Sequence, residues 1–319
     1  MFNTLTVCIP VYNTQQEFLI RILDDLSVQT FKSFDVLVQD DSSTTDYSQI
    51  YENYITKLNL YVNRNEHNVG MVKNWNKVLA SVNTKYFIIL GHDDGLAPDA
   101  LEKLISPLED DEQIIVSSCS CHYIDPNGIA MATHHNINHR DNIFIRSNKY
   151  LLQGKDAVAL CLNNGIALGE LTCQMFRTNN RFQYDINFFH AADLDYFLAR
   201  VTGCSVGKVA YNTDKLIFRR LHKNALTEKN YLNGYVTLER ERIFKKYCQS
   251  YNFTWSEINR FRAFLLACAY MDLMRFPKHK STVVIRFALS QILRHTRFSL
   301  FSYLRVIYSI VFHINLDSR

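Results

Sequence analysis

The first half of the chain alternates short apolar runs with segments in which apolar side chains recur at helical spacing. Short apolar runs favour strands, and recurrence every three or four residues favours amphipathic helices. Strands are expected at Thr6–Val11, Phe34–Gln39, Leu60–Asn63 and Tyr86–Leu90, and helices around Phe18–Leu26, at Ser48–Leu58, at Met71–Val82 and from Pro98 onward. This rhythm predicts an α/β fold with a mostly parallel, Rossmann-like sheet flanked by helices.

The second half of the chain carries a different pattern. A polar stretch rich in His and Asn, Cys121–Tyr150, is typical of a long insertion between elements. Further helices are expected at Lys155–Leu162 and Ala191–Val201, and further strands at Cys173–Arg177, Val206–Tyr211 and Lys215–Leu221. From Tyr231 only helical patterns remain. We therefore expect one domain over residues 1–225 and a helical C-terminal region over residues 226–319.

Polar side chains come directly after several of the expected strands. In sheets of this kind, ligands bind in the crevice outside the carboxyl ends of the strands. The residues in this position are Tyr12, Asn13, Asp40, Asp41, Asp93 and Asp94. Their shared location predicts a ligand site at this edge of the sheet.

Asp93 and Asp94 are the first candidates for chemistry. Two adjacent carboxylates behind a buried strand are costly unless a cation or hydrogen-bond donors compensate their charge. Hard oxygen ligands suit Mg²⁺ or Mn²⁺, and a metal so placed stabilises the charge that develops on a departing nucleoside diphosphate. The alternative interpretation is a helix N-cap or a solvated turn.

Three further clusters have side chains that suit a nucleotide. Tyr12 and Asn13 can stack on a base and hydrogen-bond to it, although Asn is also a common turn residue. Asp40 or Asp41 can accept a hydrogen bond from a base or ribose, while the Ser and Thr residues that follow cap the next helix. Taken alone, capping is the better interpretation. Gly70 opens a helix and allows a ligand to approach the backbone closely.

Composition and charge set the C-terminal region apart. The 319 residues are 47% hydrophobic with a net charge of +4, which supports a large core and is too weakly basic to predict nucleic-acid binding. No acidic residue occurs between Asp272 and Asp317, where Lys, Arg and aromatic residues recur. This pattern indicates a basic amphipathic segment on an anionic membrane surface, or else a packed helix with a solvated basic face. We expect neither a signal peptide nor a membrane span.

Taken in order, the clusters resemble a known family. The series Ile9–Asn13, Gln29–Thr30, Asp40–Thr44, Asn68–Gly70 and Asp93–Pro98 resembles family 2 glycosyltransferases of the GT-A fold over residues 1–220. Each motif is common by itself, and the ordered set is specific. The resemblance implies an inverting enzyme that uses Mg²⁺ or Mn²⁺ to move a sugar from a nucleoside-diphosphate sugar to a hydroxyl of a saccharide acceptor.

The resemblance also assigns residues by position. Positions that match the family's nucleotide-sugar contacts are Pro10, Tyr12, Asn13, Asp40, Asp41, Asn68, Gly70, His92, Asp93 and Arg220. Positions that match its metal shell are Asp93, Asp94 and His222. Gly91 stands where the family's D-x-D motif has its first acid, which puts the usual ribose contact in doubt. The alternative interpretation of Arg220 and His222 is that they are ordinary charged residues on the surface, without contact to diphosphate or metal.

The general base follows from the same resemblance. Inverting transfer needs a carboxylate that takes the proton from the acceptor hydroxyl. The family carries it as the Asp of an E-D pair at the start of a helix that ends in Arg. Asp193, with Arg200 downstream, matches that position, while Ala192 replaces the Glu. A helix N-terminal acid explains the location of Asp193 equally well, and Asp195 is expected to be structural.

The class of sugar, the pathway and the acceptor are inferred by analogy with the family. The resemblance implies hexosyl or deoxyhexosyl transfer in bacterial surface-polysaccharide synthesis, of the O-antigen, lipopolysaccharide or capsule type. The acceptor is then a saccharide linked to polyprenyl diphosphate. The basic C-terminal segment predicts a cytoplasmic protein held peripherally at the inner face of the cell membrane, and no nucleic-acid partner is expected.

Other functions with similar architecture make different demands on the sequence. A dehydrogenase carries G-x-G-x-x-G and a P-loop enzyme carries G-x-x-x-x-G-K, and neither motif occurs here. A sugar nucleotidyltransferase requires a Gly-rich basic loop where this chain has Tyr12–Gln15. A non-catalytic relative that only binds sugar nucleotides is the serious rival, with Gly91 and Ala192 as its support.

Overall fold

The computed structural model describes residues 3–131, 151–164, 170–178, 182–204, 207–222, 235–248, 251–259, 261–262 and 265. The chain forms two compact units. The first contains residues 1–154, 168–186 and 199–222, and the second contains residues 155–167, 187–198 and 223–319. The units interleave along the chain, and the expected division at residue 225 stays a prediction.

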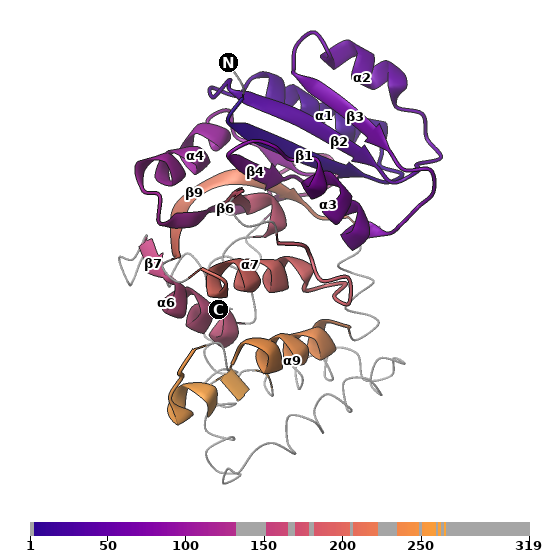
Figure 1. Cartoon of the computed structure of the whole chain (residues 1–319). Helices are drawn as coiled ribbons and strands as arrows, with labels where there is room; N and C mark the ends of the chain where they lie inside the picture. The colour runs from indigo at the N-terminus through magenta and orange to yellow at the C-terminus, as the bar shows by residue number, and fades with distance from the viewer. Residues whose placement is uncertain are drawn as a thin grey trace. The chain divides into compact units, whose positions relative to one another are not determined.

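Four parallel strands form one half of the sheet in the first unit (Figure 1), in the order β3-β2-β1-β4. The strands are β1 (Leu5–Val11), β2 (Phe34–Asp40), β3 (Leu60–Arg64) and β4 (Tyr86–Ile89), and the helices between them are α1 (Gln16–Ser27), α2 (Ser48–Tyr54) and α3 (Met71–Ala80). In register, Leu5 of β1 pairs with Phe34 of β2 and with Tyr86 of β4. The carboxyl ends of these strands therefore meet at one edge of the sheet, as the sequence predicts.

The other half of the sheet mixes strand directions. The order continues β4-β8-β6-β9-β5, and β7 pairs with β9. These strands are β5 (Gly95–Leu96), β6 (Ile114–Ile124), β7 (Leu151–Gln153), β8 (Gln174–Arg177) and β9 (Lys208–Arg220). β6 and β9 are parallel, whereas β5, β7 and β8 pair antiparallel with their neighbours. The helix-flanked α/β sheet is as predicted, and its parallel part comprises the first four strands and the β6–β9 pair.

β9 takes the place of the two separate strands expected after residue 205. Its register with β6 is irregular: Asn212 pairs with Cys119, but Lys215 pairs with the next residue, Ser120. The extra residues form a bulge, which inserts residues into one strand without ending it. The expectation of two strands was wrong because the polar residues of a bulge resemble a turn in sequence.

The polar stretch expected as an insertion, Cys121–Tyr150, begins inside β6. Its first residues, up to Ile124, continue that strand. Residues 132–150 lie outside the described part of the chain.

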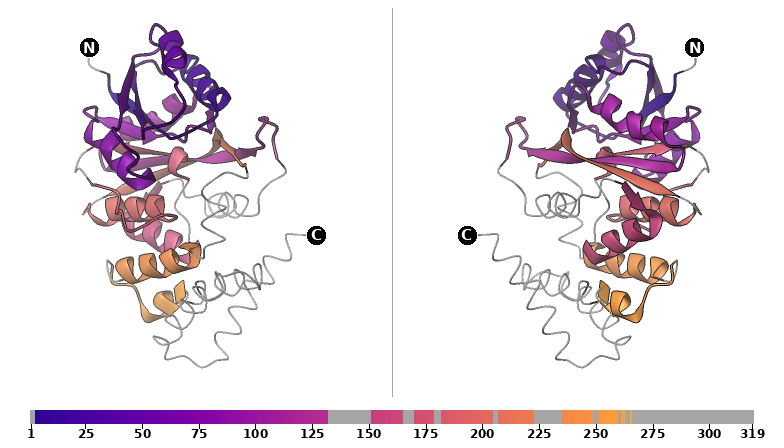
Figure 2. Two further views of the ribbon diagram at one scale, coloured as in Figure 1. Left: turned by 90° about the vertical axis from the view of Figure 1, so that its right-hand side faces the viewer. Right: turned by 90° about the vertical axis from the view of Figure 1, so that its left-hand side faces the viewer.

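Helices cover both faces of the parallel strands (Figures 1 and 2). α1 and α2 lie on one face and α3 on the other, because the chain reverses direction across the sheet between β3 and β4. The main core packs strand side chains against α1, through Leu19, Ile22 and Leu23, and against α4 (Ala100–Asp110), through Leu101 and Leu104. These five leucines and isoleucines are fully buried, so the loops at the strand ends grow from a rigid base.

In the second unit, the described helices include α6 (Gly154–Asn164), the first part of α7 (Ala192–Thr202) and α9 (Tyr235–Tyr247). Val236, Ile243 and Tyr247 of α9 are buried and recur at helical spacing on one face. The same face carries Glu239, a fully buried carboxylate. The basic segment expected between Asp272 and Asp317 lies outside the described residues.

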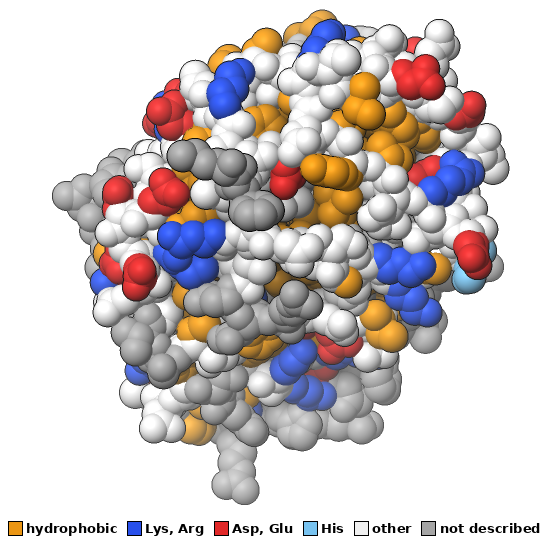
Figure 3. Space-filling view, turned by 45° about the horizontal axis from the view of Figure 1, so that its top comes forward, with side chains coloured by type: hydrophobic (Ala, Val, Ile, Leu, Met, Phe, Trp, Pro, Cys, Tyr) orange, Lys and Arg blue, Asp and Glu red, His pale blue; other side chains and the backbone are white. Residues whose placement is uncertain are grey.

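Two observations concern the described surface. Within the described residues, no helix is both long and apolar enough to cross a bilayer. On the face in Figure 3, acidic and basic side chains are interspersed around apolar ones. The charges on this face therefore do not gather into a continuous patch of one sign.

Candidate nucleotide and metal site

The loop after β1 is fastened to the loop after β2 through Asn13. The Asn13 side-chain Oδ1 accepts hydrogen bonds from Thr44 N at 2.8 Å and Thr44 Oγ1 at 3.0 Å, and Asn13 N donates to Ser43 Oγ at 2.9 Å. Asn13 has a φ of 47°, a left-handed conformation that Asn tolerates better than most residues. Tyr12 beside it is 47% exposed, which leaves an aromatic ring at the strand end available for stacking on a base.

Asp40 is buried at the end of β2 and holds its own loop. Asp40 Oδ1 accepts hydrogen bonds from Ser43 N at 2.9 Å and Ser43 Oγ at 2.5 Å. Asp40 Oδ2 forms an ion pair of 2.6 Å with Arg64 Nη1 at the end of β3. Asp40 therefore closes its own loop by local side-chain-to-backbone hydrogen bonding. The expectation that Ser or Thr of this loop caps the next helix was wrong, because the N-cap of α2 is Tyr47, which forms no side-chain cap hydrogen bond.

Asp41 joins the end of β2 to the start of α3. Its carboxylate, 2% exposed as a residue, accepts hydrogen bonds from Asn65 Nδ2 at 2.7 Å, Val69 N at 2.9 Å and Gly70 N at 2.9 Å. Asn68 Oδ1 lies 2.9 Å from the same Gly70 N. Gly70 has a φ of 88°, where a side chain would be strained, so this position requires glycine.

Asp94 is enclosed by donors from distant parts of the chain. Thr172 Oγ1, in the short 3₁₀ helix Leu171–Cys173, donates to Asp94 Oδ2 at 2.6 Å. Arg219 Nη1 lies 3.3 Å from the same oxygen, and Arg220 N donates to Oδ1 at 3.1 Å. Burial raises the pKa of Asp94, and the Arg219 charge opposes that shift. Its contacts are those of a carboxylate that anchors the loop to the end of β9.

Asp93 faces a histidine instead. Asp93 Oδ2 lies 2.9 Å from His222 Nε2, just past the end of β9, and both side chains are partly exposed. Burial raises the pKa of Asp93, but the hydrogen bond with His222 and the charges of His92 and Arg219 outweigh it and hold that pKa below its ordinary value. His222 Nδ1 is buried and has no hydrogen-bond partner among the residues that the structure describes.

The Asp93–His222 pair fits a divalent cation in its chemistry. A carboxylate oxygen and an imidazole nitrogen converge on one point, and both are common metal ligands. Across the described residues, no group of three His, Cys, Asp or Glu side chains is arranged to hold a metal.

Gly91 occupies a position too crowded for a side chain. A Cβ atom here would lie 2.7 Å from Asp94 Oδ2 and 3.0 Å from Asp93 Oδ1. The Gly91 backbone N–H lies 3.1 Å from Thr172 Oγ1. The glycine that departs from the D-x-D pattern therefore matches the tight packing of the two acids that follow it.

Arg220 is engaged with the protein. Its guanidinium donates to the backbone oxygens of Asp93 at 2.8 Å, Asp125 at 3.0 Å and Pro126 at 3.0 Å, and it stacks on the Phe18 ring at 4.7 Å. The residue is 4% exposed. These contacts fix the Asp93 loop, and the expectation that Arg220 contacts the diphosphate stays a prediction.

The structure therefore brings the predicted residues of the first unit together at one sheet edge, in two groups. One group contains Asn13, Asp40, Asp41 and Gly70, and the other contains Asp93, Asp94, Arg220 and His222. Pro10 lies within β1, paired in register with Gln39, and His92 is partly buried beside Asp93. Residues that the sequence analysis did not single out are Arg64, Asn65, Thr172 and Arg219, which hold the predicted acids in place. Among these four, only Arg219, adjacent to Arg220, gave a sequence signal.

Asp193 lies in the second unit, at the second residue of α7. Its Oδ1 accepts a hydrogen bond from Leu194 N at 2.8 Å. Asp195 is buried, and its carboxylate contacts Lys246 Nζ at 2.8 Å and Tyr247 Oη at 2.8 Å in α9. Asp195 thus makes the contacts expected of a structural residue.

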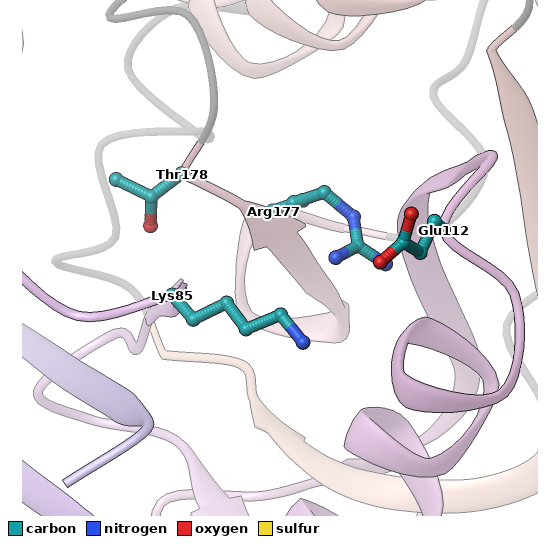
Figure 4. Close-up of a pocket in the computed structure, with 4 residues that line it drawn as sticks. All are labelled: Lys85, Glu112, Arg177 and Thr178. Carbon is teal, nitrogen blue, oxygen red and sulfur yellow. The ribbon is translucent and has the colours of Figure 1, made fainter.

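A separate hollow of about 480 Å³ lies at the opposite edge of the sheet, lined by Lys85, Glu112, Arg177 and Thr178 (Figure 4). Lys85 precedes β4 and Arg177 ends β8, so the hollow lies away from the carboxyl end of β4. The Arg177 guanidinium donates to the backbone oxygens of Ile114 and Leu108. Arg177 therefore serves the packing of this edge.

Comparison with known proteins identifies the family. The sequence model of glycosyl transferase family 2 matches residues 6–167, half of the chain. The chain belongs to glycosyl transferase family 2.

Curated relatives of this family 2 chain align with only part of its sequence. It is 28% identical over 126 residues to an uncharacterized glycosyltransferase of Methanocaldococcus jannaschii, covering 39% of this chain and 43% of that protein. It is 33% identical over 100 residues to the poly(ribitol-phosphate) beta-N-acetylglucosaminyltransferase TarS of Staphylococcus aureus, covering 30% of this chain and 17% of TarS. The chain thus spans less than half the length of these curated relatives.

Solved structures confirm the GT-A fold predicted for this family 2 chain. TarS residues 1–349 of S. aureus, in complex with UDP-GlcNAc, superpose with a TM-score of 0.59 at 17% identity, covering 87% of this chain and 74% of that one. The mannosyltransferase PcManGT of Pyrobaculum calidifontis, in complex with GDP-Man and Mn²⁺, gives a TM-score of 0.59 at 13% identity, covering 98% and 81%.

Proposed function

We propose that this protein is an inverting glycosyltransferase that moves a sugar from a nucleoside-diphosphate sugar to a hydroxyl of a saccharide. The observation that carries the proposal is the Asp93–His222 pair, held at 2.9 Å at the sheet edge where the loops of β1 and β2 are fastened together. Family membership and the fold of TarS, which was solved with UDP-GlcNAc, support it.

In this proposal the two groups of residues at the sheet edge have separate roles. Tyr12 stacks on the base, while Asn13, Asp40 and Asp41 keep the surrounding loops in the conformation that receives it. Contacts to ribose and phosphate come from the Asn68–Gly70 and His92 region. Binding to loops that are already ordered reduces the entropic cost of association.

Asp93 and His222 would hold Mg²⁺ or Mn²⁺. A divalent cation there supplies Lewis acidity that stabilises the charge on the departing diphosphate. Asp94 and Arg220 contribute by fixing the position of the Asp93 loop through Thr172, Arg219 and the backbone. The PcManGT structure, which contains Mn²⁺ with GDP-Man, supports a metal of this kind.

We propose Asp193 as the general base. Its carboxylate takes the proton of the acceptor hydroxyl while the hydroxyl oxygen forms a bond to the anomeric carbon. The bond from that carbon to the diphosphate oxygen breaks in the same displacement, which inverts the anomeric configuration. The position of Asp193 in the first turn of α7 supports the assignment made from the family's motif.

A donor screen tests the proposed reaction. We expect release of nucleoside diphosphate from one of a panel of uridine, thymidine and guanosine diphosphate sugars, with hexose and deoxyhexose donors and with saccharide acceptors present. Removing the metal with EDTA should lower the rate by about two orders of magnitude or more, since metal Lewis acidity contributes several kcal/mol. Mn²⁺ should restore it. Tight nucleotide binding without turnover of any donor would instead favour the non-catalytic relative.

For the acceptor, we propose a saccharide linked to polyprenyl diphosphate in bacterial surface-polysaccharide synthesis, of the O-antigen, lipopolysaccharide or capsule type. The site would then work in the cytoplasm at the inner face of the cell membrane. The support is the basic, aromatic segment between Asp272 and Asp317 in the sequence. Such segments bind anionic lipid surfaces through charge and apolar contact.

Vesicle sedimentation checks the membrane part of this proposal. We expect the full chain to sediment with vesicles that contain anionic phospholipid at low salt, and to be released at high salt because the charges are screened. Neutral phosphatidylcholine vesicles are the control. Equal binding to both kinds of vesicle, or binding to neither, contradicts an electrostatic membrane contact.

A further inference from the structure

Glu239 of α9 is a fully buried carboxylate that the proposed reaction does not use. Its two oxygens accept three backbone hydrogen bonds: Phe189 N donates to Oε1 at 2.8 Å, His190 N donates to Oε2 at 2.7 Å, and Ala191 N donates to Oε2 at 2.8 Å. Hydrogen bonds to an ionised acceptor are stronger than neutral ones. One side chain therefore fixes three consecutive residues of the chain.

Those three residues lead directly into α7. The helix begins at Ala192, and Ala191 is its N-cap, since Asp195 N donates to Ala191 O at 2.8 Å. The N-terminus of a helix leaves backbone N–H groups without partners, and Ser, Thr, Asp or Asn at the N-cap normally compensates for this. Alanine has no side-chain acceptor. Glu239 supplies a carboxylate to this segment from another helix.

α9 holds the other side of Asp193 as well. Lys246 Nζ contacts both Asp195 oxygens, at 2.8 and 3.1 Å, and Tyr247 Oη lies 2.8 Å from Asp195 Oδ1 and 2.9 Å from the backbone oxygen of Asp195. Lys246 comes seven positions after Glu239, about 10 Å along a helix, so both project from the same face of α9. Asp193 lies between the two fixed points, at residues 189–191 and at residue 195.

We propose that Glu239 is a positioning residue for Asp193, holding the segment before α7 so that the Asp193 carboxylate keeps the orientation needed for proton transfer. The inference rests on the proposed function, in which Asp193 is the general base. Displacing a catalytic group by about 1 Å can lower a rate about 100-fold even though the group itself is intact. The effect of Glu239 should therefore appear in kcat and only through Asp193.

The test compares four forms of the full chain by nucleoside diphosphate release: wild type, Glu239→Gln, Asp193→Asn and the double variant. Glu239→Gln keeps the size of the side chain but replaces one acceptor oxygen by a donor that faces a backbone N–H. We expect its kcat to fall by about 10- to 100-fold, with the donor KM and the nucleotide Kd within about 2-fold of wild type. In the Asp193→Asn background, the same substitution should cause no further loss, because residues that act as a unit are non-additive.

Glu241→Gln is the matched control. Glu241 lies on the same helix, is 6% exposed as a residue, and pairs with Lys245 at 2.5 Å rather than with the segment before α7. Its kcat should stay within about 2-fold of wild type, since its ion pair with Lys245 does not involve the segment before α7. If Glu239→Gln does not fold, Tyr247→Phe replaces it as the decisive variant. That change removes the hydroxyl that contacts Asp195 Oδ1 and the backbone oxygen of Asp195, and it should lower kcat with KM unchanged.

The outcomes separate the two proposals. Wild-type kcat in Glu239→Gln, together with an inactive Asp193→Asn, overturns the positioning role and leaves the base assignment standing. An equal loss from Glu239→Gln in both backgrounds also overturns it, since the effect then does not pass through Asp193. Full activity in Asp193→Asn sinks the base assignment, and the positioning role with it.

Discussion

Replacing Asp193 by Asn is expected to abolish sugar transfer while nucleotide binding persists. Asparagine keeps the shape of the side chain but cannot take a proton from the acceptor hydroxyl. General bases contribute about 10²- to 10⁴-fold to a rate, so kcat should fall by at least about two orders of magnitude. Nucleoside diphosphate release measures the rate, and calorimetric titration with the nucleotide measures binding.

Asp156→Asn is the control for this experiment. Asp156 lies in the first turn of α6, in the same unit as Asp193, and is exposed to solvent. It shares the chemistry and the helical position of Asp193 without the proposed role, so its kcat should match that of wild type. Activity of Asp193→Asn within about 3-fold of this control would show that another group takes the proton.

Substituting each of the two adjacent acids after β4 is expected to have a different large effect. Asp93→Asn removes the proposed metal ligand, so the Mn²⁺-dependent rate should fall by about 10²- to 10³-fold, with little change in Tm. Asp94→Asn should act on the fold, because its carboxylate accepts hydrogen bonds from Thr172, Arg219 and the backbone of Arg220. Replacing this buried carboxylate leaves its donors without a charged acceptor, which lowers the free energy of unfolding by about 2–4 kcal/mol.

Thermal unfolding and Mn²⁺ titration of the rate separate these effects. Asp93→Asn should shift the Mn²⁺ concentration needed for half-maximal rate, and Asp94→Asn should shift Tm. A lowered Tm in Asp93→Asn with an unchanged metal requirement would mean that Asp93 is the structural acid. The same loss in both variants would mean that the pair acts as one unit.

The parallel half of the sheet could be predicted from the sequence because its signals are local. Each strand is a short apolar run and each helix has an apolar face, so pattern alone locates both. β6 was missed because it reads IIVSSCSCHYI, with Ser and Cys in place of branched apolar residues. Ser117 and Ser118 are nevertheless buried, because β6 is an interior strand of the sheet, paired with β8 and with β9. That burial depends on strands far along the chain.

The candidate site, too, could be predicted only in part from the sequence. The positions of Tyr12, Asp41 and Asp93 follow from the rule that ligands bind at strand ends. The partners of the acids could not be predicted, because the donors to Asp94 come from residues 78 and more positions away. Glu239 gave no signal at all: in sequence it is one of several charged residues in an amphipathic helix, and only its burial distinguishes it.

The bulge in β9 has a consequence for how this chain can vary in length. Arg219, Arg220 and His222 all follow the bulge, and successive side chains of a strand point to opposite faces. One residue gained or lost between Ile217 and Arg220, where the register with β6 is continuous, would exchange the faces of the two arginines and separate Asp94 from its anchor. The segment that can absorb such a change is residues 213–216, where β9 already holds more residues than β6. Insertions and deletions in homologues should therefore gather there, upstream of the site.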